Sequence, residues 1–132
     1  MPYTDFTYYG PKENRFDVIP WVKEVSDQDS LVKDRWIKVI YNGTKNSNTQ
    51  KNICYCQWAD AGPYESDDVE YVFGTAQPAI TIGLKSGIDL SPAMQNCLNM
   101  GDHNDYVSWQ FVDEPIEGPW TNIVTNSPPD WN

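Results

Sequence analysis

Residues 87–101 read GIDLSPAMQNCLNMG, and this stretch predicts the end of a strand followed by a short helix. Ser91 suits the position that caps the start of the helix, because its hydroxyl can accept a hydrogen bond from an early helical N–H group. Pro92 suits the first helical position, where no backbone donor is needed, and apolar residues follow at helical spacing. Gly101 can adopt the left-handed conformation that ends a helix. Asp89 lies at the junction, where the strand ends and a side chain can face a groove, and it is the first candidate for chemistry.

The composition indicates one folded domain with a large negative charge. At 132 residues the chain is long enough to bury a core, and its 39 % hydrophobic and 14 % aromatic residues argue against a disordered acidic segment. The net charge of −10 argues against binding to nucleic acid or to an anionic membrane. No apolar run approaches the length of a membrane span, and the N-terminus lacks the apolar core of a signal peptide. We therefore expect no nucleic-acid partner and no membrane span.

The three cysteines leave several states open. Cys54 and Cys56 are two residues apart in a strand-like run, so they share a face and cannot easily pair with each other. One of them can form a disulfide with Cys97, or all three can remain buried thiols. A zinc site built from the three cysteines and His103 is a further alternative, but the spacing is not that of a zinc knuckle. We expect no metal and no cofactor.

Short strands account for most of the remaining pattern. The run RWIKVIY is rich in residues that favour strands, and Asn42-Gly43 after it is a strong hairpin signal. The return run KNICYCQW alternates, as does YVSWQFV later in the chain. The pattern predicts an all-β fold of about six short strands with one short helix, which is typical of a small closed β-barrel. The strands are expected over residues 3–10, 35–41, 51–58, 69–74, 79–84 and 106–112, with a further one near 122–125.

Common catalytic motifs are absent. The sequence has no glycine loop that would cradle phosphate, no GxSxG elbow and no HExxH motif. An acidic cluster after Gly62-Pro63 invites a calcium site, but its spacing does not match an EF-hand loop, so we expect a solvated acidic loop. Carboxylates beside aromatic residues remain, and they suit carbohydrate chemistry, in which aromatic rings stack on sugars and Asp or Glu supplies the acid and base. The acidic cluster comprises Glu65, Asp67, Asp68 and Glu70.

Three segments together resemble the double-psi β-barrel of the rare lipoprotein A, expansin and barwin-like families. They are CQWADAGPY, GIDLSPAMQNCLNM and VSWQFV. DAGPY stands where the lipoproteins carry an Asp-Arg-Gly-Pro-Phe loop, and IDLSPAM stands where they carry an Ile-Asp-Leu-Ser junction. The resemblance implies a six-stranded double-psi β-barrel with one or two short helices over residues 33–113, an N-terminal extension over 1–32 and a wrapped C-terminal tail over 114–132.

The resemblance also implies a pair of catalytic acids. Asp89 matches the general acid of the glycan-cleaving members, and Asp60 matches the second acid, in the Gly-Pro loop. The chain departs from the family pattern in two ways: Ala61 replaces the arginine, and the motif histidine between the two loops is missing. The structural alternative is that each aspartate accepts backbone N–H bonds and closes its own turn. To act as an acid near neutral pH, Asp89 would need a raised pKa, which requires partial burial.

These expectations lead to two functional hypotheses. The first is a secreted or periplasmic carbohydrate-active protein that binds or cleaves peptidoglycan or another cell-wall glycan, in the manner of a lytic transglycosylase or glycosidase. Asp89 would donate the proton, Asp60 would assist, and the sugar would stack on exposed aromatic rings. The second is a non-catalytic binding module, or a secreted effector or inhibitor that contacts a protein partner, and the missing arginine and histidine motivate it. The candidate substrate-binding aromatics are Tyr64, Tyr71 and Trp120.

Overall fold

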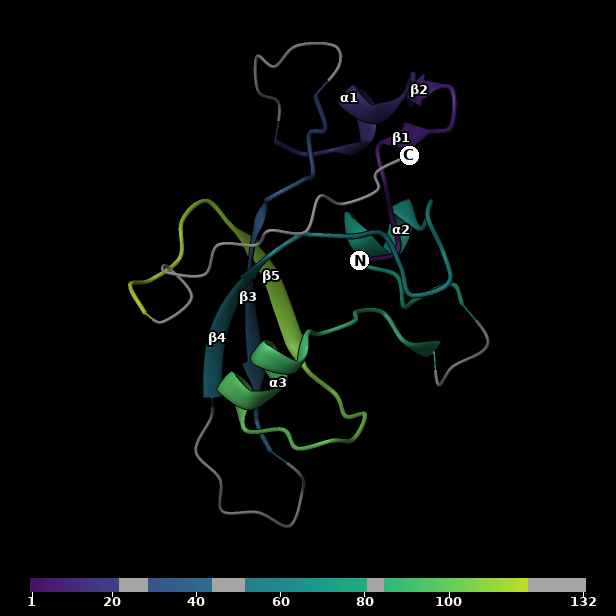
Figure 1. Cartoon of the computed structure of the whole chain (residues 1–132). Coiled ribbons are helices and arrows are strands. Elements are labelled where there is room, and N and C mark those ends of the chain that lie inside the picture. The colour runs from purple at the N-terminus through teal and green to yellow at the C-terminus, as the bar shows by residue number, and fades with distance from the viewer. Residues whose placement is uncertain (22–28, 44–51, 81–84, 119–132) are drawn as a thin grey trace. The chain divides into compact units, whose positions relative to one another are not determined.

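A computed structural model describes residues 1–21, 29–43, 52–80 and 85–118 (Figure 1). The described residues form two compact units. Among the described residues, the first unit is built from Met1–Asp34 and Ala59–Asp89, and the second from Arg35–Trp58 and residues 90–118. One antiparallel sheet lies in each unit, and the helices are short, so the chain has a small β-rich fold.

The sheet of the second unit has three antiparallel strands in the order β4-β3-β5 (Figure 1). They are β3 (Trp36–Tyr41), β4 (Asn52–Gln57) and β5 (Ser108–Val112). Val39 lies at the centre of the sheet, opposite Cys54 on one side and Trp109 on the other. The three strands predicted for this part of the chain are therefore confirmed, and so is the antiparallel pairing of the first two.

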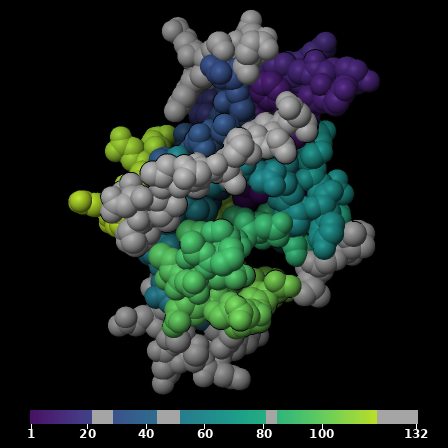
Figure 2. Space-filling view, in the orientation of Figure 1, coloured from purple at the N-terminus to yellow at the C-terminus, as the bar shows by residue number. Residues whose placement is uncertain are grey.

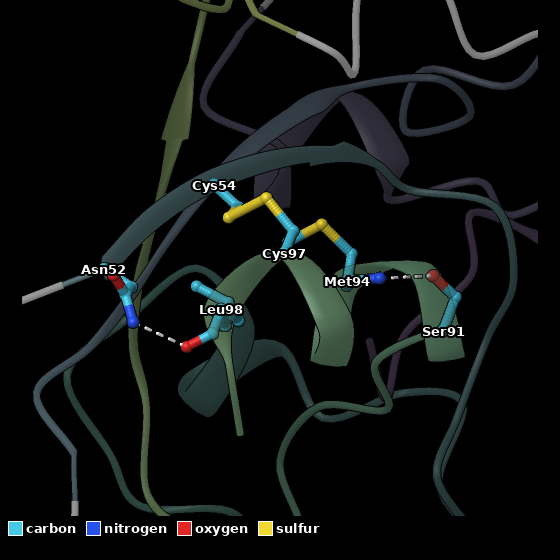
Figure 3. The surroundings of a disulfide bond; sticks show 6 residues. All are labelled: Asn52, Cys54, Ser91, Met94, Cys97 and Leu98. Carbon is cyan, nitrogen blue, oxygen red and sulfur yellow. Dashed lines mark hydrogen bonds between the residues drawn. A yellow bond between two sulfur atoms is a disulfide. The ribbon is translucent and has the colours of Figure 1, made fainter. Parts of the chain in front are cut away.

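Helix α3 (Pro92–Leu98) packs against β4 in the same unit (Figure 3). A disulfide joins Cys54 on the strand to Cys97 on the helix. Two residues further toward the start of β4, the side-chain nitrogen of Asn52 donates a hydrogen bond to the Leu98 carbonyl at 2.8 Å. The covalent bond and the hydrogen bond together determine which part of the strand faces the helix.

The ends of α3 follow from the local sequence, with one correction. The Ser91 hydroxyl accepts a hydrogen bond from the Met94 backbone nitrogen at 3.3 Å, and Pro92 lies in the first turn, as predicted. The helix ends before Gly101, because Asn99 already takes the left-handed conformation, with φ of 56°. Asparagine tolerates this conformation since its short polar side chain can hydrogen-bond locally. Gly101 also has a positive φ, of 75°, but it lies beyond the end of the helix.

In the first unit, the N-terminal segment runs beside the loop at residues 60–68. The Gly62 N–H group donates to the Met1 carbonyl at 2.8 Å, and the Thr4 N–H group donates to the Ser66 carbonyl at 3.0 Å. Backbone bonds of this kind fix the conformation of a loop that has no regular secondary structure of its own. The predicted Gly-Pro loop is therefore held at both of its ends by the N-terminal segment.

The hairpin of the first unit consists of β1 (Phe6–Thr7) and β2 (Gly10–Pro11), and helix α1 (Arg15–Val18) follows it (Figure 1). Asp5, just before the hairpin, is fully buried and accepts hydrogen bonds from the Ser30 hydroxyl and from the Leu31 N–H group, both at 2.7 Å. The Arg15 guanidinium, also buried, lies 3.3 Å from the same carboxylate. This network fastens the base of the hairpin to the helix and to the chain at Ser30 and Leu31.

Helix α2 (Val69–Val72) replaces one predicted strand. The β-branched and aromatic residues of VEYVFG favour a strand, but the N–H groups of Val72 and Phe73 donate to carbonyls four residues earlier. The Asp68 carboxylate, at the start of the helix, is buried and accepts a hydrogen bond from the Ala79 N–H group at 2.8 Å. The prediction of a strand at residues 69–74 is therefore wrong, because contacts made by Asp68 override the local preference.

The strands of the described residues form a two-stranded and a three-stranded sheet and do not close into a barrel. Most of the predicted strand at 79–84 and the one near 122–125 fall outside the described residues. The β-rich fold agrees with the all-β expectation, and the six-stranded double-psi β-barrel stays a prediction. Within the described ranges no helix has both the length and the apolar character needed to cross a membrane.

Candidate functional site

Asp60 begins the Gly-Pro loop of the first unit and closes its own turn. Its Oδ1 atom accepts a hydrogen bond from the Ala61 N–H group at 2.7 Å, and its backbone carbonyl accepts one from the Met1 amino group at 3.3 Å. The residue is exposed to solvent. A short side chain that bonds the adjacent backbone is a common structural device in turns. The geometry of Asp60 is thus that of the structural alternative raised by its position in the sequence.

Asp89 lies in the same unit, in an irregular segment just before the cap of α3, and it is also exposed. A carboxylic acid that donates a proton near neutral pH needs a raised pKa, and burial is the usual means of raising it. Neither Asp60 nor Asp89 has that burial. Both aspartates are accessible to a ligand, and their role as catalytic acids stays a prediction.

The three aromatic residues predicted to stack on sugars differ in their exposure to solvent and in whether the structure describes them. Tyr64, on the Gly-Pro loop, is 67 % exposed. Tyr71, on α2, is half-buried, and a Cβ atom placed on Gly87 would overlap its ring, so this ring packs against the chain. Trp120 lies outside the described residues. Tyr64 is therefore the candidate aromatic that presents its ring to solvent.

Two further exposed tyrosines of the first unit were missed by sequence reasoning. Tyr8 and Tyr9 form the turn between β1 and β2 and are 87 and 94 % exposed. Of the strand predicted over residues 3–10, only Phe6 and Thr7 form β1, a turn follows them, and Gly10 belongs to β2. Thr7 before the two tyrosines and Gly10 after them are the signal that could have located the turn, because hydroxyl residues and glycine favour turns.

Metal binding finds no support in the part of the chain that the structure describes. No group of three or more His, Cys, Asp or Glu side chains there is placed to hold an ion. The Cys54–Cys97 disulfide removes two of the thiolates that the zinc alternative needs, and burial raises the pKa of the remaining Cys56 thiol to about 11. In the acidic cluster, Asp67 pairs with Lys12 at 2.6 Å, and the buried Asp68 carboxylate accepts a hydrogen bond from the Ala79 N–H group.

A polar cluster in the second unit joins the end of β3 to a distant loop. The Tyr41 hydroxyl donates to Asp105 Oδ2 at 2.8 Å, and the Tyr106 N–H group donates to Asp105 Oδ1 at 2.7 Å. The His103 Nε2 atom lies 3.7 Å from Oδ2. The hydrogen bond from Tyr41, followed by that from Tyr106, holds the pKa of Asp105 below its usual value, and the bond to Asp105 raises the pKa of Tyr41.

This cluster predicts an acid-sensitive contribution to stability. The pKa of Asp105 is lower in the folded chain than its ordinary value of 3.8, so its contribution is complete above that pH and is lost as the pH falls through the folded value. The destabilisation caused by Asp105→Asn is therefore expected to be largest near neutral pH and to shrink below about pH 4. Urea unfolding midpoints of both proteins, measured across that range, test it.

The variant Tyr41→Phe is the matched control, because it keeps the ring and removes the hydrogen-bond donor that lowers the pKa of Asp105 most. It is expected to reproduce the pH dependence of Asp105→Asn. A difference from the wild type that is the same at neutral and at acid pH would contradict the proposed linkage.

Comparison of this chain with protein-family models, curated proteins and solved structures finds no match. The double-psi barrel resemblance accordingly stays a prediction that depends on the three segments quoted for it. Among the described residues, the first unit presents three exposed tyrosines, Tyr8, Tyr9 and Tyr64, and it also contains the two exposed aspartates.

Proposed function

We propose that this chain is a non-catalytic binding module for a cell-wall glycan of low charge density. The observation that carries the proposal is the exposed ring of Tyr64 on a loop that the N-terminal segment holds in place. Tyrosine rings offer an apolar face on which the C–H face of a sugar can stack, and a hydroxyl that can bond its rim. The resemblance of the DAGPY and IDLSP segments to glycan-active families supports the choice of ligand class.

The backbone hydrogen bonds that hold the loop at residues 60–68 favour binding, because a preorganised surface loses little conformational entropy when a ligand binds. The Glu65 N–H group donates to the Pro63 carbonyl at 2.7 Å, which closes the turn that carries Tyr64. The net charge of −10 disfavours strongly anionic polymers, so a neutral or weakly charged glycan is the better ligand.

Binding is preferred to cleavage because of the two aspartates. Both are exposed, and Asp60 is committed to a bond with the backbone, so the pair lacks the burial that separates the roles of acid and base in glycosidases. A secreted or periplasmic location is part of the proposal. The Cys54–Cys97 disulfide supports it, since such bonds persist mainly in oxidising compartments.

The proposal predicts that Tyr64→Ala weakens retention on an insoluble glycan by roughly tenfold, the effect of losing one stacked ring. Asp89→Asn is expected to leave retention unchanged. Neither the wild type nor Asp89→Asn should release soluble fragments from the glycan. Co-sedimentation with cellulose, chitin and peptidoglycan, followed by analysis of the supernatant for reducing ends and muropeptides, measures both properties.

The matched control is Tyr106→Ala, which removes a tyrosine that is 92 % exposed but lies in the other unit. It should bind like the wild type. Fragment release that disappears in Asp89→Asn would instead make the chain an enzyme with Asp89 as its acid. If the wild type is retained on none of the polymers, the glycan class is wrong, and the protein-partner hypothesis takes its place.

A further inference from the structure

The turn between β1 and β2 displays two aromatic rings in a defined arrangement. The ring centroids of Tyr8 and Tyr9 are 5.3 Å apart, and their planes are almost perpendicular, at 89°. Both rings are nearly as accessible as in an isolated peptide. In Figure 2 the purple atoms of this N-terminal segment lie at the surface. The two exposed rings therefore meet at a right angle, and we call this pair the Tyr8–Tyr9 corner.

Hydrogen bonds from one threonine shape this corner. The Thr7 hydroxyl accepts a bond from the Tyr9 N–H group at 3.2 Å and donates one to the Gly10 carbonyl at 3.1 Å. Below the hairpin, the buried pair of Asp5 and Arg15 fastens its base to α1. Tyrosine has few rotatable bonds, so two tyrosines on a braced turn provide contact area at a low cost in entropy. The backbone turn that carries the two rings is thus held by hydrogen bonds before a ligand arrives.

The chemistry of the corner selects an uncharged, amphipathic ligand. Its surfaces are ring faces and phenol hydroxyls, with no aliphatic side chain at the tip of the turn. The cations of the adjoining segment are already engaged, because Lys12 pairs with Asp67 and Arg15 pairs with Asp5. A pyranose ring has the matching features, an apolar C–H face and a rim of hydroxyl groups.

We infer that the Tyr8–Tyr9 corner is a second carbohydrate contact, which holds a single neutral pyranose ring of a soluble chain. Perpendicular rings cannot both lie flat on an extended polysaccharide surface, so this contact takes one sugar ring and not a crystalline face. The inference rests on the proposed glycan-binding function, and it assigns a contact that is separate from Tyr64.

An NMR titration of the ¹⁵N-labelled full chain with cellohexaose and with chitohexaose tests this. Saturable shifts of the Tyr8, Tyr9 and Gly10 amides are expected with at least one of the two sugars. Tyr8→Ala and Tyr9→Ala should each weaken that binding roughly tenfold, the effect of losing one stacked ring. Binding should be insensitive to salt, because no charged pair is part of the contact.

Two control variants distinguish the contribution of the two rings from that of the turn that carries them. Thr7→Val keeps both tyrosines and removes the hydroxyl that shapes the turn, so it should weaken binding by roughly threefold. Tyr106→Ala should have no effect. If the amide shifts are confined to residues 60–67 and both Tyr8→Ala and Tyr9→Ala bind like the wild type, Tyr8 and Tyr9 do not bind the sugar. That result would contradict this inference and leave the proposed function unchanged. No shift with either sugar, together with no retention on any polymer, would overturn both.

Discussion

Arg15→Met is expected to lower the free energy of unfolding by roughly 3–5 kcal/mol, the usual effect of removing one partner of a buried ion pair. Asp5 has no exposed surface and Arg15 is 1 % exposed, so the substitution leaves a carboxylate that water cannot solvate. It also removes the bond of 2.7 Å that the guanidinium donates to the Asp29 carbonyl. Equilibrium unfolding in urea, followed by tryptophan fluorescence, measures the loss.

Two comparisons sharpen this experiment. The double variant Asp5→Asn with Arg15→Met removes both charges together and is expected to recover part of the loss, because no unpaired charge stays buried. Lys12→Met breaks an ion pair whose acidic partner, Asp67, is largely exposed, and it should cost at most about 1 kcal/mol. If Arg15→Met costs no more than Lys12→Met, the Asp5–Arg15 pair is not buried in solution.

The Cys54–Cys97 disulfide is expected to make the second large contribution. Its partners are 43 residues apart, and a bond that closes a loop of this size stabilises a folded chain by roughly 2–4 kcal/mol, mainly by restricting the unfolded chain. Cys97→Ser, which alters an exposed position on α3, should therefore lower the free energy of unfolding by that amount. Unfolding curves with and without dithiothreitol measure it.

Reduction provides an internal control. Dithiothreitol should bring the wild type close to the stability of Cys97→Ser and should leave that variant unchanged. Cys56→Ala, which alters the free thiol of the same strand, should remain sensitive to reduction. If Cys56→Ala lost this sensitivity while Cys54→Ala kept it, the bond would join Cys97 to Cys56 instead.

The sequence alone could not decide which cysteine pairs with Cys97. Alternation places Cys54 and Cys56 on one face of β4, and either could face Cys97. The choice depends on how far along the strand the helix docks. The bond from Asn52 to the Leu98 carbonyl, between residues 46 apart, is one of the contacts that determine this position, and it leaves no mark on the local pattern.

For the candidate site, too, the sequence predicted some features and only the tertiary structure showed others. The sequence named Asp89 from its place before the helix and Tyr64 as an aromatic in a loop, and the family resemblance added Asp60. It could not show that both aspartates are exposed, since burial is set by neighbours from elsewhere in the chain. The strand predicted over residues 3–10 includes Tyr8, because aromatic residues favour strands, whereas the local hydrogen bonds of the Thr7 hydroxyl to Tyr9 and Gly10 form a turn there.

By itself the sequence determined the elements whose signals lie within a few residues. Ser91 and Pro92 are enough to begin α3, and Asn42-Gly43 between two alternating runs is enough to pair β3 with β4. The tertiary structure decided the rest. Residues 69–74 became helical despite their strand-forming side chains, and Asp5 became a buried partner of Arg15. In both cases the deciding contacts join residues ten or more positions apart, and such contacts override weak local preferences because they bury groups that must be paired.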